Sequence, residues 1–243
     1  MTAATRRYTD VAIIPARGGS KRIPRKNIRD FAGRPIIAYS IDAALRSELF
    51  ARVLVSTDDP EIAEVARGCG AETPFLRPAA LADDHTGTLA VVQHALGWLA
   101  EAGEAVRWAC CIYATAPFLQ PEHLRAARDQ LAASGKSYVF TVTSFPAPVQ
   151  RALRLTAAGE VEALYPQHRQ TRSQDLEPAY HDAGQFYFGT AAAWQRGDAI
   201  FSPASLPLIL PRHLVQDIDT DEDWRRAELM YAAQRQVGQD GRP

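Results

Sequence analysis

The chain has 243 residues, of which 47% are hydrophobic and 23% charged, and its formal net charge is −1. A chain of this length and composition buries roughly 70–75% of its unfolded surface in a globular core, which excludes collagen-like, low-complexity and disordered classes. The balanced charge gives no general attraction to nucleic acid or to an anionic membrane, and no apolar run approaches the ~20 residues of a membrane span. Three cysteines are too few for a disulfide scaffold. We therefore expect a cytoplasmic protein with neither nucleic acid nor membrane as a partner.

Short apolar runs alternate with helical patterns through the first part of the chain. Continuous apolar runs indicate strands buried on both faces; they lie at residues 11–14, 53–55, 109–113 and 138–142, with a further short strand expected at 71–76. Helices are expected from Pro35 to about residue 45, from Pro60 to about 66, and over 86–102 and 122–133. This order predicts an α/β fold with a parallel sheet covered by helices on both faces. Ligands of such sheets lie beyond the carboxyl ends of the strands, which selects the loops at 15–29, 56–59, 83–88 and 114–117.

The alternation stops at Ser144. Residues 144–182 contain four prolines and show no regular period, so we expect an inserted lid, small subdomain or dimerisation arm within one domain that spans residues 1–243. The strand pattern returns at 185–189, 208–210 and 214–218, and a last helix is expected from Asp221 to about residue 235.

The loop after the first strand carries the strongest functional signal. Six Lys and Arg residues and no acid occupy the 13 positions 17–29, and two of the three lysines of the chain, Lys21 and Lys26, are among them. Gly18 and Gly19 let the backbone approach a ligand and present its N–H groups, and the cations add charge that holds phosphates. This pattern favours a polyphosphate-binding loop, although it is neither the P-loop nor the dinucleotide motif. The alternative is a solvated basic loop that meets an acidic protein.

Asp217 and Asp219 form the second signal, at the end of an apolar run. In a strand, a spacing of two places both carboxylates on one face, where a cation between them relieves their repulsion. Hard oxygen ligands beside phosphates suit Mg²⁺, so both residues are candidate metal ligands. The alternative is an exposed strand end, with Asp221 or Thr220 capping the last helix.

Other polar loops give weaker signals. Asp58 is a candidate ligand contact, whereas Asp59 is expected to cap the helix that starts at Pro60. Thr86 or Thr88 is expected to cap the following helix, whose free N–H groups suit a ligand. No Ser/His/Asp, Cys/His or zinc-ligand spacing stands out, so hydrolase and zinc-site readings are discounted.

These motifs together resemble one family. Residues 14–27, IPARGGSKRIPRKN, resemble the opening motif of the CMP-acylneuraminate synthetases, which are cytidylyltransferases that activate nine-carbon 2-keto acids with CTP. The resemblance continues, in order, through VSTDD at 55–59, LRP at 76–78, TGT at 86–88 and DIDT at 217–220.

Two segments depart from the sialate-specific pattern. IYATAPF at 112–118 stands where the sialate enzymes carry Gln-Pro-Thr-Ser-Pro, and DAGQFY at 182–187 stands where they carry Asn-Gly-Ala. In both segments, and in the loop sequence KRIPRKN, this chain resembles the pseudaminic acid cytidylyltransferases of bacterial flagellin and surface-glycan pathways.

The resemblance implies a single three-layer α/β/α, Rossmann-like nucleotide-diphospho-sugar transferase domain with a mostly parallel sheet. It also implies that residues 144–182 form a homodimerisation arm that helps to complete the partner's sugar pocket. In the implied reaction, the anomeric hydroxyl of the sugar acid attacks the α-phosphate of CTP and pyrophosphate leaves. Asp217, or a hydroxyl held by the Mg²⁺ cofactor, accepts the proton.

The roles that the resemblance implies fall into four groups. Arg17 and Lys26 bind the triphosphate, with Lys21 nearest the α-phosphate. The remaining nucleotide contacts are Ala16, Gly18, Gly19, Ser20, Asn27, Asp58 and Thr86. Contacts to the sugar are Thr115, Gln185, Tyr187 and, across a dimer, Arg172; for Thr115 and Tyr187 ordinary strand packing is an equal alternative. Asp217 and Asp219 hold the metal.

Two classes of alternative stay open from the sequence. One is the same chemistry on another acid, as in a CMP-legionaminate, CMP-sialate or CMP-Kdo synthetase. The other is a non-catalytic nucleotide-binding protein of the same fold, which would bind CTP without releasing pyrophosphate.

Overall fold

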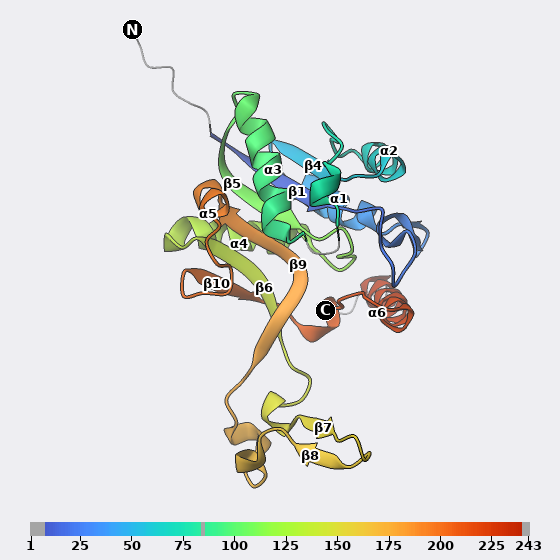
Figure 1. Cartoon of the computed structure of the whole chain (residues 1–243), viewed down its shortest axis with the longest axis vertical. Helices are drawn as coiled ribbons and strands as arrows, with labels where there is room; N and C mark the ends of the chain where they lie inside the picture. The colour runs from blue at the N-terminus through green and yellow to red at the C-terminus, as the bar shows by residue number, and fades with distance from the viewer. Residues whose placement is uncertain (1–7, 84–85, 240–243) are drawn as a thin grey trace.

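A six-stranded sheet forms the centre of the computed structural model, which describes residues 8–83 and 86–239 (Figure 1). Its strands, in the order in which they lie side by side, are β10 (Ser205–Ile209), β6 (Tyr138–Ser144), β9 (Tyr180–Thr190), β5 (Ala105–Ile112), β1 (Tyr8–Pro15) and β4 (Arg52–Ser56). β1 pairs in parallel with β4 and β5, and β10 pairs in parallel with β6. Only β9 runs antiparallel, between β5 and β6. The predicted mostly parallel sheet is confirmed.

Helices cover both faces of this sheet. Successive side chains of β1 point to opposite faces, so each set packs against a different group of helices. Ala12 and Ile14 are buried with α1 (Ile37–Arg46), α2 (Pro60–Gly68) and α4 (Pro121–Ser134). Val11 and Ile13 are buried with α3 (Thr88–Glu101) and α5 (Ala191–Arg196) on the opposite face. This three-layer α/β/α arrangement is the one expected. No helix in the described part of the chain is long and apolar enough to cross a membrane.

The last helix, α6 (Asp221–Gln239), packs beside the basic loop rather than on the sheet. It closes a separate apolar cluster in which Trp224 meets Phe31, with ring centroids 5.6 Å apart. Phe31 belongs to a two-residue hairpin, β2 (Asp30–Phe31) with β3 (Arg34–Pro35), that directly follows the loop. Ile23 and Ile218 are buried in the same cluster, so it joins the loop to the segment that carries Asp217 and Asp219.

The strand expected at 214–218 is wrong. A short 3-10 turn covers Arg212–Leu214, and residues 215–219 that follow it belong to no strand. Its apolar side chains are explained by other contacts, since Ile218 is buried beside Trp224 and Val215 packs with Leu210 and Ala183. The short strand expected at 71–76 is reduced to two isolated bridges, Leu54 with Glu72 and Thr57 with Leu76.

The capping predictions have different outcomes. Of the two residues predicted to cap the last helix, Thr220 does so and Asp221 does not: the Thr220 hydroxyl accepts the Asp223 N–H at 3.2 Å and the Asp223 carboxylate accepts the Thr220 N–H at 2.9 Å, a reciprocal cap. The prediction for α3 is wrong. The residue before α3 is Gly87, and neither threonine caps this helix with its side chain. Asp59 caps α2 as predicted, by accepting the N–H groups of Glu61 and Ile62 at 2.9 and 3.1 Å.

The segment between β6 and β9 projects away from the sheet (Figure 1). It contains an antiparallel hairpin, β7 (Leu153–Leu155) with β8 (Val161–Ala163), and three short 3-10 turns. The hairpin buries little of its own surface, because Leu153, Leu155 and Val161 are 63%, 76% and 60% exposed.

Candidate functional site

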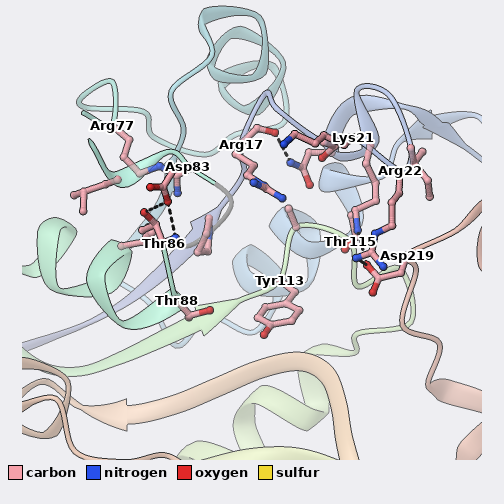
Figure 2. Close-up of a pocket in the computed structure, with 18 residues that line it drawn as sticks. Arg17, Lys21, Arg22, Arg77, Asp83, Thr86, Thr88, Tyr113, Thr115 and Asp219 are labelled. Atoms are coloured by element: carbon pink, nitrogen blue, oxygen red, sulfur yellow. Dashed lines mark hydrogen bonds and ion pairs between the residues drawn. The ribbon is translucent and has the colours of Figure 1, made fainter. Parts of the chain in front are cut away.

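A cavity of about 300 Å³ lies at the carboxyl ends of β1 and β5, where the fold class predicts a ligand. Five cations and two carboxylates line it: Arg17, Lys21, Arg22, Lys26, Arg77, Asp83 and Asp219 (Figure 2). The excess of positive charge in a polar cavity suits a multiply charged anion such as a triphosphate.

The basic loop is held in shape by hydrogen bonds to the end of β4 and by the side chain of Asn27. The Ala16 N–H donates to Ser56 O at 3.0 Å, and the Gly18 N–H donates to the Asp58 carboxylate at 3.1 Å. The Asn27 amide, buried in the turn, donates to Arg17 O at 2.9 Å. The N–H groups of Ala16 and Gly18 are therefore bonded to the residues that end and follow β4. Asn27 lines the cavity and also orders the loop.

Asp58 and Asp59, which follow β4, bind the basic loop through their carboxylates. Asp58 is not among the residues that line the cavity; its carboxylate accepts the Gly18 N–H and lies 3.6 Å from the Arg77 guanidinium. Asp59 forms an ion pair with Arg25, a residue in the left-handed conformation with φ 55°. The Arg25 guanidinium, by its hydrogen bond, lowers the pKa of the Asp59 carboxyl below its usual value. In this structure both acids thus bind the loop and its neighbours.

The lysines and arginines of the loop differ in their contacts. Arg17, Ser20 and Lys21 line the cavity. The Lys26 ammonium also lines it but donates to Ile218 O at 2.6 Å and lies 3.4 Å from Asp219 Oδ1. Arg22 meets the same carboxylate at 2.8 Å. Lys26 thus joins the loop to the 217–219 segment as well as facing the cavity.

Asp217 and Asp219 lie close enough to interact electrostatically although no strand holds them. Burial, and then the charge of Asp219, raise the pKa of the Asp217 carboxyl above its ordinary value. Asp219 lines the cavity, whereas Asp217 is not among the residues that line it. Within the described residues no group of three or more acidic, His or Cys side chains gathers to hold a metal. A pair of carboxylates nevertheless fits Mg²⁺, which commonly takes one or two carboxylates and completes its shell with phosphates and water.

The four predicted sugar contacts do not share one place. Thr115 lines the cavity. Tyr187 is buried behind Tyr113, with the two hydroxyl oxygens 3.2 Å apart. Gln185 is 3% exposed and its amide donates to Leu214 O at 2.6 Å, which ties β9 to the turn before Asp217. Arg172 lies on the projecting segment, away from the cavity lining, and pairs with Asp175 at 2.7 Å.

Thr86 lines the cavity, as predicted for a ligand contact, and donates both its N–H and its hydroxyl to Asp83 at 2.7 Å. Residues 84 and 85 of the same predicted loop lie outside the described residues.

Sequence reasoning missed several lining residues, of which Arg77 is the most informative. It is 5% exposed, and its Nε atom is buried with no hydrogen-bond partner among the described residues. Burial lowers the pKa of its guanidinium, against the opposing effect of Asp58. A buried arginine whose head group lines a cavity is poised for an anionic or carbonyl ligand. The only sequence signal was its place in the Leu76-Arg77-Pro78 motif, to which no role was attached.

A basic Gly-rich loop after β1, a cationic cavity at the strand ends and a nearby carboxylate pair define a nucleotide-binding α/β protein of the nucleotidyltransferase class. The family described as Cytidylyltransferase matches residues 11–222, and the chain belongs to this family.

Among its relatives is the pseudaminic acid cytidylyltransferase of Campylobacter jejuni, 48% identical over 91% of this chain and 96% of that protein. The CMP-N,N'-diacetyllegionaminic acid synthase of Legionella pneumophila is 33% identical over 90% and 95% of the two chains. A solved CMP:2-keto-3-deoxy-manno-octonic acid synthetase complexed with CTP shares the fold, with a TM-score of 0.67 at 17% identity over 93% of this chain and 99% of that one.

Proposed function

We propose that this protein transfers CMP from CTP to the anomeric hydroxyl of pseudaminic acid, a nine-carbon 2-keto sugar acid, and releases pyrophosphate. The cationic cavity beyond β1 and β5 carries the nucleotide half of this proposal. The 48% identity to a pseudaminic acid cytidylyltransferase over nearly the whole chain supports the sugar half.

The reaction makes one bond and breaks one. The anomeric oxygen attacks the α-phosphorus, the bond from that phosphorus to the β-phosphate bridging oxygen breaks, and the hydroxyl proton passes to a base. Positioning and charge stabilisation account for most of the rate in such transfers. Arg17, Lys21 and Lys26 bind the triphosphate in this proposal, with Lys21 facing the charge that develops at the α-phosphate. Gly18, Gly19, Ser20 and Asn27 shape the loop around the nucleotide, and Arg77 and Thr86 bind it from the opposite wall.

Asp217 and Asp219 would hold the Mg²⁺ that this chemistry implies, and the ion would supply charge neutralisation on the phosphates. Asp217, whose carboxyl lies within electrostatic reach of Asp219, is the proposed proton acceptor. Thr115 and Tyr113 contact the sugar acid, and Tyr187 supports Tyr113 from behind. The projecting segment, residues 144–182, is proposed to pair with that of a second copy and to bring Arg172 to the partner's sugar acid.

The experiment measures the release of pyrophosphate from CTP in the presence of Mg²⁺, with pseudaminic, legionaminic, sialic or Kdo acid added one at a time. Release with pseudaminic acid is expected. Release with legionaminic acid alone would keep the chemistry and correct the substrate, an alternative that the 33% identical legionaminate synthase supports. CTP binding without release from any acid would favour a nucleotide-binding protein.

A further inference from the structure

Three polar side chains, joined in series by hydrogen bonds, lead from the cavity wall into the sheet; they are called the hydrogen-bond chain below. Tyr113 directly follows β5 and lines the cavity, while Tyr187 and Asp182 lie on β9. The two tyrosine hydroxyls are 3.2 Å apart, their rings meet edge to face with centroids 5.7 Å apart, and the Tyr187 hydroxyl donates to Asp182. Figure 2 shows Tyr113 across the cavity from Arg17 and Lys21, with its hydroxyl directed toward β9.

The same hydrogen-bonded side chains join the segment that follows β5 to strand β9. Tyr113 belongs to the segment 112–118, and Asp182 and Tyr187 belong to the segment 182–187. They are far apart in sequence, and the antiparallel pairing of β5 with β9 brings them together. The contact places a β9 carboxylate, through Tyr187, behind a residue of the cavity wall.

The direction of each bond in the hydrogen-bond chain follows from counting protons. A carboxylate only accepts, and a tyrosine hydroxyl has one proton to donate. Asp182 accepts the Tyr187 proton on one oxygen and the Gly184 N–H, at 2.9 Å, on the other. Tyr187 then has no proton left for Tyr113, so in their mutual hydrogen bond Tyr113 is the donor. The Thr88 hydroxyl also hydrogen-bonds to Tyr113, in the sense that lowers the pKa of Tyr113, which makes Thr88 a donor to the Tyr113 oxygen. Tyr113 has no second proton, so its remaining lone pair meets a ligand as an acceptor.

Burial of Tyr187 keeps water from replacing its hydrogen bonds. Tyr187 is 5% exposed, and burial raises the pKa of both tyrosines, so each keeps its proton at neutral pH.

We propose that Asp182 is a positioning residue that fixes the Tyr113 hydroxyl as a hydrogen-bond acceptor, and that this acceptor selects a sugar acid with a hydrogen-bond donor, an acylamino N–H or a hydroxyl, at the facing position. This inference rests on the proposed function and deepens it. A site built to accept a hydrogen bond discriminates strongly against a ligand that lacks the donor, because the buried acceptor is then left unpaired.

The test uses Asp182→Asn, Tyr113→Phe and their combination in the full chain. The amide nitrogen of an asparagine can donate to Tyr187, which lets the hydrogen-bond chain reverse so that Tyr113 donates into the cavity. Asp182→Asn and Tyr113→Phe are each expected to raise the KM for the sugar acid roughly tenfold, the effect of about 1.4 kcal/mol. The double variant should be no worse than Tyr113→Phe, because both changes remove the same acceptor. The Kd for CTP, measured by calorimetry without sugar, should stay within about twofold.

Tyr138→Phe is the matched control. Tyr138 is a fully buried tyrosine on β6 whose hydroxyl has no hydrogen-bond partner among the described residues, so its removal should leave both constants unchanged.

An unchanged sugar KM in Asp182→Asn, additive effects in the double variant, or a parallel loss of CTP affinity would overturn the inference while the wild-type chain still turns over. If the wild-type chain releases no pyrophosphate with any acid of the panel, the proposed function itself fails and the inference fails with it.

Discussion

Gly18 lies against the carboxylate of Asp59 so closely that a Cβ atom at position 18 would be 2.5 Å from Asp59 Oδ2. The same carboxylate caps α2 and pairs with Arg25. A glycine of the basic loop, a helix cap and a loop arginine therefore depend on one another.

Gly18→Ala is expected to lower the melting temperature and to weaken CTP binding. The added carbon must displace Asp59, and overpacking of this kind typically costs about 1–3 kcal/mol. Thermal unfolding and calorimetry with CTP measure the two effects. Gly19→Ala is the control for stability, because a Cβ there meets nothing within 4 Å among the described residues. An equal loss of stability in both variants would contradict the steric explanation.

Lys21→Ala is expected to reduce kcat by about 100-fold or more, the usual cost of losing one charged group that stabilises a transition state. The rate of pyrophosphate release at saturating CTP measures this. Lys136→Ala is the matched control, since that ammonium is bound to Pro203 O at 2.9 Å, outside the residues that line the cavity. A Lys21 variant with near-normal kcat would remove this lysine from its proposed role.

Asp219→Ala is expected to abolish the Mg²⁺-dependent activity while the protein stays folded. Asp219 is a proposed metal ligand, and its loss leaves Arg22 and Lys26 without their carboxylate. Titration of activity with Mg²⁺, alongside circular dichroism, separates the two effects. Asp221→Asn removes a nearby carboxylate that pairs with Arg29 at 2.8 Å instead, and it should keep a normal Mg²⁺ response. An undiminished response in the Asp219 variant would exclude this residue as a ligand.

Asp10→Asn is expected to stabilise the protein at pH 7. Burial raises the pKa of the Asp10 carboxyl, although Arg128 and Arg107 oppose the shift. A raised pKa in the folded state gives stability that is present below the unfolded pKa of about 3.9 and lost as the pH rises through the folded pKa. Ionised Asp10 is thus a cost at pH 7, which asparagine removes. The gain in free energy of unfolding should vanish near pH 3.

Urea unfolding of both proteins across this pH range tests the sign. Asp129→Asn removes an exposed carboxylate that pairs with the same Arg128 at 3.3 Å, and it should change stability little. A gain for Asp10→Asn that persists at pH 3 would point to a cause other than ionisation.

The hairpin of the projecting segment is expected to be a contact between two copies of the chain. Leu155 and Val161 face each other across β7 and β8, and Leu153 faces Ala163 on the same side. This face is apolar and exposed, whereas Arg154 and Glu162 form an ion pair at 2.6 Å on the opposite face. Leu155→Glu with Val161→Glu should convert a dimer into a monomer in analytical ultracentrifugation. Leu229→Glu, on α6 and 68% exposed, should not; a wild-type monomer would exclude the dimer.

The local patterns of the sequence determined the order of the elements. Apolar runs such as 11–14 indicated strands buried on both faces, because a sheet covered by helices on both sides buries consecutive residues. The basic loop was evident for a similar reason: its glycines and cations are contiguous in the sequence, although distant residues such as Asp58 and Ile218 hold it in place. The cap by Asp59 and the location of the cavity at the strand ends followed from the same local rules.

Only the tertiary structure decided which distant residues meet. The apolar run at 214–218 reads as a strand, but Ile218 packs on Trp224 instead, and no local pattern distinguishes these two ways of burying an isoleucine. Arg77 reaches the cavity because its segment pairs with Thr57 at the end of β4. Tyr113 reaches Tyr187 because β9 runs antiparallel beside β5. The basic loop and Asp219 were therefore evident from the sequence, whereas other lining residues such as Arg77 and the pairing of side chains depended on long-range packing that sequence periodicity does not encode.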